Sequence, residues 1–339
     1  MRPRIVSLLP SATELVCALG LREQLVGVSH ECDFPPGVER LPRVTRTRIA
    51  HSADSLCIDR QVREELATAS ALYQVDGALL ASLDPDLLVT QALCDVCAVS
   101  ASDVEALARG LPRAARIFNL QPACLHDILD NVTALGAAAG VPERAALVRT
   151  QMEARIARVK ARSAAIPGAQ RPRVVMLEWL DPLFDAGHWN PELVELAGGV
   201  PVLSRSGQPS TTIEWSALRA AAPDLIFVAC CGFDLARSVV DVERLRAHAQ
   251  WTALAAVQRG KVWVADGNAY FNRPGPRIVD SLELLAHVLH PALHPLPAGI
   301  TPAVQIVARA GGVSDRAVSN AIEIGDVPGI QCQPLTGRR

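Results

Sequence analysis

RIVSLLPSATELVCALGLREQLVGVSHECDFP, which is residues 4–35, is the stretch of sequence that decides the fold. Its first apolar run, residues 5–9, has the length of a buried strand and ends at Pro10. Ser11 and Glu14 then form the Ser-x-x-Glu pattern of a capping box, which predicts that a helix starts there. The stretch therefore begins with a strand that leads directly into a helix.

A second strand and a group of polar residues follow. Gly20 stands where a left-handed residue would end the helix, and residues 25–28 form another apolar run. His30, Glu31 and Cys32 come directly after this run. Ligands bind beyond the carboxyl ends of strands in open α/β sheets, so we expect these three side chains at a ligand-binding site. A polar turn without a ligand is the alternative interpretation.

The rest of the chain repeats this alternation of strands and helices. Helical segments include residues 61–73, and further strands are predicted at 87–90, 116–120, 173–178, 200–203, 225–229 and 261–265. The alternation predicts mainly parallel sheets with helices on both faces. Residues 142–165 lack an internal breaker and predict one helix of about 23 residues, or roughly 35 Å.

The two halves of the sequence are alike. The order strand, capped helix, glycine, strand occurs at residues 4–28 and again at 173–203. We therefore predict two similar α/β lobes joined by one long helix, with a ligand cleft between them that is lined by the loops after the strands. The expected first lobe, linking segment, second lobe and tail are residues 1–120, 121–168, 169–294 and 295–339.

Composition argues against several classes of function. The 339 residues carry a formal net charge of -2, which gives no electrostatic basis for binding nucleic acid or an anionic membrane. Aromatic residues make up 4%, which argues against a base-stacking surface. No stretch approaches the roughly 20 apolar residues of a membrane span. The first apolar run is too short for a secretory signal, so we expect a cytoplasmic protein.

Nine cysteines make the predicted cleft rich in thiols. Their odd number and the lack of a signal predict that they form no disulfide framework. Cys94 and Cys97 form a Cys-x-x-Cys pair at a strand-to-helix junction, where a helix N-terminus would lower the pKa of a thiol. Together with Cys32 or Cys231 they could ligate zinc or iron, or they could be a redox pair.

Several short motifs resemble a known family. They are residues 7–14 (SLLPSATE), 26–28, 84–87, 223–226 and 260–263. They resemble the cobalamin-binding branch of the helix-linked (class III) substrate-binding proteins of ABC importers. The resemblance implies two lobes on a rigid helix, small closure motions and a corrinoid held between the lobes; relatives hold haem, an iron chelate or a metal ion. Without an export signal, the chain is similar to cytoplasmic homologues.

The resemblance implies a role for aromatic residues in the second half. Trp179, Asp181, His188 and Trp189 lie in the loop expected after the strand at 173–178. The flat faces of the two tryptophans could cover a corrin ring, and their N–H groups could donate hydrogen bonds to its amide side chains. His188 could be an axial ligand of cobalt. A packed contact between the lobes is the alternative interpretation.

Two further loops complete the predicted ligand site. Phe233 follows the adjacent residues Cys230 and Cys231. Neighbouring side chains diverge at the end of a strand, so we expect Cys231 to face the cleft and Cys230 to face the core. Tyr270, which follows the strand at 261–265, could form another wall of the cleft.

The sequence therefore predicts a non-catalytic, cytoplasmic cobalamin-binding protein. No Gly-x-Ser-x-Gly, phosphate-loop or dinucleotide motif appears in it. The alternative is an enzyme that depends on zinc, iron or reactive thiols in the cleft. A weaker alternative is the substrate-binding component of an ABC importer, with surface carboxylates that dock on transporter arginines; corrinoid-handling proteins are the other expected partners. Arg273 and Arg277 are expected to be surface or capping residues.

Overall fold

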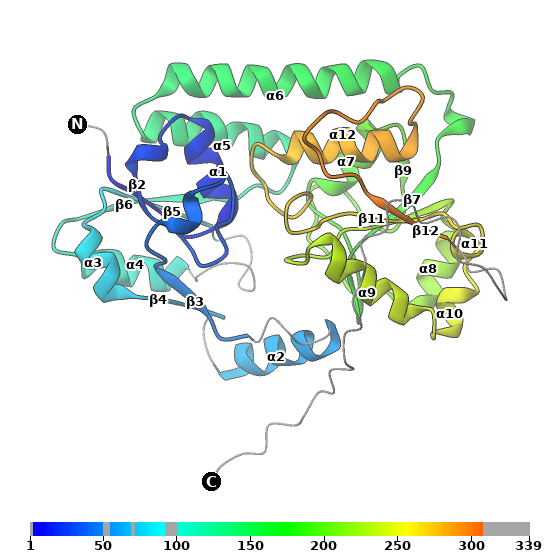
Figure 1. Ribbon diagram of the computed structural model, residues 1–339, viewed down its shortest axis with the longest axis horizontal. Helices are drawn as coiled ribbons and strands as arrows, with labels where there is room; N and C mark the ends of the chain where they lie inside the picture. The colour runs from blue at the N-terminus through cyan, green and yellow to red at the C-terminus, as the bar shows by residue number, and fades with distance from the viewer. Residues whose placement is uncertain (1–2, 50–54, 69–71, 92–100, 308–339) are drawn as a thin grey trace, which may run out of the picture.

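Helix α6, Pro142–Ser163, is the longest helix among the described residues and runs along both halves of the molecule (Figure 1). The computed structural model describes residues 3–49, 55–68, 72–91 and 101–307. These residues form two α/β lobes, one before α6 and one after it. The prediction of two lobes joined by one long helix is confirmed.

The first lobe is built on a parallel sheet with strand order β2-β1-β5-β6. Its strands are β1 Ile5–Ser7, β2 Leu25–Gly27, β5 Leu87–Gln91 and β6 Arg116–Leu120. The helices of this lobe include α1 Pro10–Ala18, α3 Gly77–Leu83 and α4 Ala101–Arg109. Strands β1 and β5 are buried along their whole length, which explains why their sequences are continuous apolar runs rather than alternating patterns.

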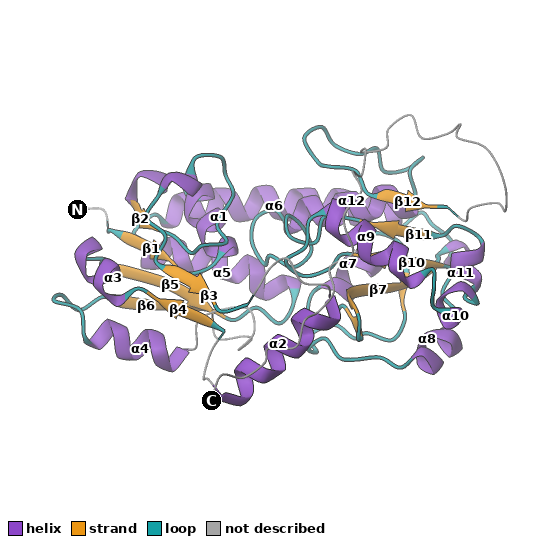
Figure 2. Cartoon of the chain, turned by 60° about the horizontal axis from the view of Figure 1, so that its bottom comes forward, coloured by secondary structure: helices purple, strands orange, loops and turns teal. Residues whose placement is uncertain are grey.

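A two-stranded antiparallel sheet and one more helix extend the first lobe. Strands β3, Thr45–Thr47, and β4, Tyr73–Val75, pair antiparallel, and helix α2, Ser55–Thr68, lies between them in the sequence. Figures 1 and 2 both show α2 alongside the region where the two lobes meet. The sequence predicts that Tyr73 ends a helix; the structure places it in β4, where it pairs with Thr47.

The second lobe has a mixed sheet with strand order β12-β11-β10-β7-β8, and β9 pairs with β7. Strands β7, β10 and β11 are parallel to one another, whereas β8 and β12 run antiparallel to their neighbours. The strands are β7 Arg173–Leu180, β8 Leu183–Asp185, β9 Val200–Pro201, β10 Leu225–Val228, β11 Val262–Val264 and β12 Val304–Ile306. The helices are α7 Asn190–Leu196, α8 Trp215–Ala221, α9 Leu235–Leu245, α10 Ala249–Thr252, α11 Ala255–Gln258 and α12 Ile278–Leu289.

Part of the predicted tail belongs to the second sheet. Residues 304–306 form β12 and pair with β11, with Val262 opposite Ile306. A three-residue strand is too short for its alternation to stand out from a segment rich in Pro and Gly. Residues 308–339 lie outside the described residues.

The lobes share a continuous apolar core beneath α6. One cluster of buried side chains includes Leu15 of α1, Leu135 of α5 (Leu125–Ala138), Met152 of α6 and Leu285 of α12. Arg155 of α6 also donates to Asp280 of α12 at 2.6 Å. The linking helices are therefore packed into both lobes, and this packing restricts how far the lobes can turn about α6.

The start of α1 differs from the prediction. Leu9 is the N-cap and Pro10 is in the first turn, with no side-chain cap hydrogen bond. Ser11 and Glu14 therefore form no capping box; the Glu14 carboxylate is bound by arginines of the second lobe instead. Gly20 follows the helix with φ of 70°, as its position predicted.

No helix in the described part of the chain is long and apolar enough to cross a membrane.

Candidate ligand-binding site between the lobes

The two lobes meet through loops that follow strands of their sheets. In the first lobe the loop after β2 carries Asp33 and Phe34, and in the second lobe the loop after β11 carries Asn268 and Arg273. Side chains from these loops bond directly across the interface: the Asn268 Nδ2 donates to Asp33 Oδ2 at 3.1 Å. This is where the topology predicts a ligand, because the carboxyl ends of the strands in both sheets point to the same region.

Arg273 is the centre of this interface. Its side chain is 6% exposed, and Nη1 lies 2.5 Å from Asp33 Oδ1 and 3.2 Å from Glu14 Oε1. Its Nη2 donates to Asp33 Oδ2 at 3.1 Å and to Asn268 Oδ1 at 2.9 Å. Arg273 thus connects its own loop to two elements of the first lobe.

Arg277, at the start of α12, completes the pairing of Glu14. Its Nε and Nη2 donate to the two oxygens of Glu14 at 2.9 and 2.6 Å. Its guanidinium also stacks over the Phe34 ring, 4.0 Å from the ring centroid. The expectation of a surface or capping residue is wrong for Arg273; Arg277 is the N-cap of α12, but its side chain pairs with Glu14 and does not cap the helix. The signal was present: Glu14 lies on the apolar helix α1 with buried neighbours on both sides, and a buried carboxylate needs a cationic partner.

These contacts shift the pKa values of the paired groups. Burial raises the pKa of Asp33, but the hydrogen bonds and charge of Arg273 outweigh burial, so the pKa of Asp33 lies below its ordinary value. Burial lowers the pKa of Arg273, but the hydrogen bond to Asp33 and the charge of Asp33 raise it by more. The pKa of Arg273 therefore lies above its ordinary value. Both groups are therefore held in their charged forms.

The predicted first-lobe site residues point in different directions. His30 Nδ1 lies 2.7 Å from Thr45 Oγ1, and its ring is 5.2 Å from the Tyr73 ring. The Tyr73 hydroxyl donates to Glu31 Oε1 at 3.1 Å. His30 and Glu31 therefore lie against the two-stranded β3–β4 sheet, and Tyr73 of β4 contacts both of them.

Cys32 lies inside the first lobe. It is 0% exposed, and its Sγ is 3.0 Å from Thr13 Oγ1 and 3.2 Å from Ser29 Oγ. Burial raises the pKa of the Cys32 thiol above its ordinary value. A buried, protonated thiol is a poor metal ligand, because the thiolate is the form that binds metals.

In the second lobe the structure brings Trp179 and Phe233 together. Their ring centroids are 4.9 Å apart, and Trp179 is only partly buried. The Trp179 Nε1 donates to the backbone oxygen of Asp181 at 3.0 Å, and the Asp181 side chain is exposed. This aromatic pair lies at the ends of β7 and β10, where the topology expects a ligand.

The remaining second-lobe candidates are more deeply packed. Trp189 is 5% exposed and donates from Nε1 to the Phe271 oxygen at 2.7 Å, so its ring is part of the core. Tyr270, which precedes Phe271 in the sequence, is also buried. His188 is half-buried with φ of 53°, and burial lowers its pKa. Cys231 is partly exposed whereas Cys230 is fully buried, as the predicted divergence of their side chains requires.

The proposed metal site is not supported. No group of three or more His, Cys, Asp or Glu side chains within the described residues could hold a metal ion. Cys94 and Cys97 lie outside those residues. The expectation of no disulfide framework left no role for Cys57, which is disulfide-bonded, while Cys17, Cys32, Cys124, Cys230 and Cys231 are free.

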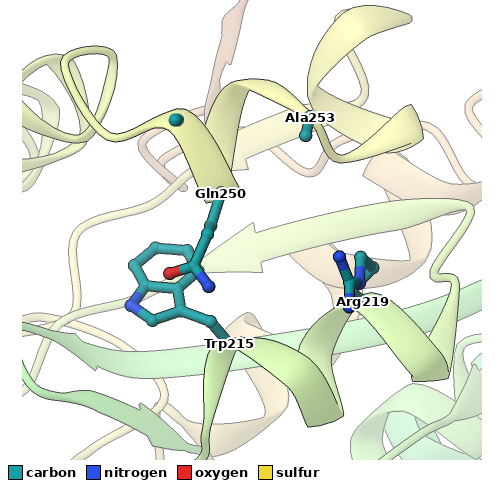
Figure 3. Close-up of a pocket in the computed structure, with 5 residues that line it drawn as sticks. Trp215, Arg219, Gln250 and Ala253 are labelled. Atoms are coloured by element: carbon teal, nitrogen blue, oxygen red, sulfur yellow. The ribbon is translucent and has the colours of Figure 1, made fainter.

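A small cavity lies on the second lobe, away from the predicted site residues (Figure 3). It has a volume of about 150 Å³ and is lined by Trp215 and Arg219 of α8 and Gln250 of α10, among others. The Trp215 ring stacks on His248 with centroids 4.3 Å apart. Ligand pockets of roughly 300–1,000 Å³ are typical, so this cavity is too small for a large planar ligand.

The two lobes, the long connecting helix and the loops that meet across the interface define a helix-linked binding protein. The chain belongs to the family described as "Periplasmic binding protein", whose model matches residues 5–269. Among curated relatives, the vitamin B12-binding protein of Vibrio cholerae serotype O1 is 25% identical over 288 residues, covering 83% of this chain and 86% of the relative.

Solved structures agree with this assignment. The periplasmic vitamin B12 binding protein BtuF of Vibrio cholerae has a TM-score of 0.62 and 25% identity, covering 86% of this chain and 98% of that protein. A periplasmic heme binding protein from Pseudomonas aeruginosa has a TM-score of 0.68 at 21% identity, covering 91% of this chain and 100% of that protein, and shares the fold.

The comparisons overturn one expectation and favour another. The expectation of a cytoplasmic protein is wrong, because the family and its vitamin B12-binding member of known structure are periplasmic. Membership of a family of ligand-binding proteins favours binding over catalysis, so the metal- or thiol-dependent enzyme has no support.

Proposed function

We propose that this protein binds cobalamin between its two lobes and hands it to an ABC importer without chemical change. The observation that carries the proposal is the similarity to the vitamin B12-binding protein of Vibrio cholerae, which extends over both lobes rather than over one shared motif. The cobalt ion is part of the cargo in this proposal, and no resident metal is needed.

Among the described residues, each lobe carries a group of side chains that could contact a corrin ring. On the second lobe, the partly buried Trp179 ring, which packs against the buried Phe233, offers a flat apolar surface to the side of a corrin ring. On the first lobe, His30, Glu31 and Tyr73 form a polar group that can exchange hydrogen bonds with corrin amide side chains. His188 carries a lowered pKa and is therefore neutral at pH 7, the form in which imidazole binds a transition metal.

Titration with hydroxocobalamin, followed by the visible spectrum and by calorimetry, tests the proposal. We expect one saturable site per chain. Hemin is the matched competitor, because the fold is shared with heme binding proteins. Saturable binding of hemin with no spectral response to hydroxocobalamin would reject cobalamin as the ligand and keep the interlobe site.

A pair of tryptophan variants locates the site. Trp179→Ala should weaken cobalamin binding by about tenfold or more, since burying a large aromatic surface contributes about 1.5–3 kcal/mol. Trp215→Ala is the control, because Trp215 lines the small cavity on the same lobe. If both variants bind cobalamin as tightly as the wild type, Trp179 does not contact the ligand.

A further inference from the structure

Helix α2 belongs to the first lobe by sequence but contacts the second lobe. The Ser55 hydroxyl, in the first turn of α2, donates a hydrogen bond to the Asp241 carboxylate of α9. Ser55 and Asp241 are each 4% exposed, so the contact is shielded from water. A hydrogen bond to a buried carboxylate is among the stronger types.

Apolar packing supports the same contact. Ile58, one turn further along α2, packs against the second-lobe core cluster, which includes the buried Phe233 and has Trp179 packed against it as well. At the other end of α2, Glu65 lies 3.8 Å from Arg48, which follows β3 of the first lobe. The 14 residues of α2 span about 21 Å, so the helix reaches from one lobe to the other.

Helix α2 connects the two lobes on the side of the molecule opposite α6. Figure 1 shows α6 along one side of the two lobes and α2 on the opposite side, and the turned view in Figure 2 agrees. The loops through which the lobes meet carry the Arg273–Asp33 contact. The lobes are thus connected on both sides, by a packed linker and by a contact between side chains.

The contact is built so that it can be released. Asp241 keeps two cationic neighbours on its own helix, Arg244 at 3.0 Å and Arg237 at 3.6 Å, so its charge stays compensated when Ser55 leaves. By contrast, Glu14 and Arg273 at the centre of the interface are both buried and depend on each other. Opening at α2 is therefore less costly than opening at the centre.

We propose that α2 is a strap that closes the interlobe ligand site on the side opposite α6, and that its release from Asp241 and the second-lobe core sets the rate of ligand exchange. This inference rests on the proposed function, because the site that α2 closes is the one between the lobes.

Exchange kinetics of cobalamin test the strap. Hydroxocobalamin bound to the full chain is chased with excess cyanocobalamin, and both association and dissociation are followed by absorbance. Ser55→Ala should speed both rates by about tenfold, the equivalent of one lost hydrogen bond to a charged group. Ile58→Ala should speed both rates by a similar factor, because it removes apolar packing against the second lobe. Glu243→Gln is the control: it removes an ion pair between Glu243 of α9 and Arg246, the C-cap of that helix, and should leave both rates unchanged.

The outcomes separate a strap from a simple wall. If dissociation accelerates while association stays at the wild-type rate, α2 only touches the ligand and does not gate it, and the proposal is overturned. Unchanged rates in both α2 variants overturn it as well.

A ligand-free measurement keeps this test separate from the proposed function. Hydrogen exchange of the α2 amides, residues 55–68, should be faster in Ser55→Ala than in the wild type and unaffected in Glu243→Gln. Should the wild type fail to bind cobalamin, the proposed function fails, while the exchange result still decides whether α2 is held by the second lobe. Equal protection of α2 in Ser55→Ala and wild type would refute the strap.

Discussion

Arg273 of the second lobe and Glu14 of the first form a buried ion pair, with 3.2 Å between Nη1 and Oε1 and at most 6% of either side chain exposed. The pair joins residues that are 259 positions apart in the sequence. It therefore fixes the closed arrangement of the lobes in a way that no contact within one lobe can.

Removing the Arg273 charge should destabilise the protein strongly. Arg273→Met leaves Glu14 buried with one arginine fewer, and we expect a loss of about 3 kcal/mol in the free energy of unfolding by urea. Arg109→Ala is the control, because Arg109 pairs with Glu105 on an exposed helix face and should cost less than about 1 kcal/mol. Equal losses in the two variants would show that the interface pair adds nothing beyond a surface pair.

The same interface should make stability depend on pH through Asp33. The pKa of Asp33 in the folded protein is below its ordinary value of 3.8, so the unfolded state binds the proton more readily. The stabilisation is complete above that ordinary value and is lost as pH falls through the lower, folded pKa. Urea unfolding between pH 7 and pH 3 should show a smaller loss of stability on acidification in Asp33→Asn than in wild type. Parallel curves would contradict this.

Accessibility predicts which thiols react in the folded protein. Cys231 is partly exposed, whereas Cys32 and Cys230 are fully buried and burial raises the pKa of both thiols. Iodoacetamide at neutral pH should therefore label Cys231 before Cys32 and Cys230, as read by peptide mass spectrometry. Cys57 should be labelled only after reduction, because it is disulfide-bonded. Early labelling of Cys32 would show that its pocket opens and would restore a reactive-thiol site.

The sequence predicts the lobes and the linking helix because those features repeat along the chain. The strand runs are continuous and apolar where both faces are covered, and α6 has no breaker over its 22 residues. Local patterns of this kind depend on neighbours in the sequence, so they can be read without a structure.

The interface could not be predicted in the same way. Glu14 fits a local capping pattern, yet its partners Arg273 and Arg277 come from the other end of the chain. Trp189 is a residue type that often contacts ligands, but its indole N–H donates to the Phe271 backbone oxygen in the core. Which of two plausible roles a side chain takes is decided by tertiary neighbours, and the sequence pattern contains no information about them.

The loop that carries Tyr270 and Arg273 offers a last test of this packing. A Cβ placed on Gly267 would lie 2.1 Å from the Cys230 backbone oxygen, so the loop and the end of β10 approach too closely for any side chain. Gly267→Ala must push the loop away, and we expect a cost of about 1–3 kcal/mol in unfolding free energy together with weaker ligand binding. Gly168→Ala is the matched control, because nothing lies within 4 Å of its Cβ. If Gly267→Ala were as stable as Gly168→Ala, the close approach of the two loops would not exist in solution.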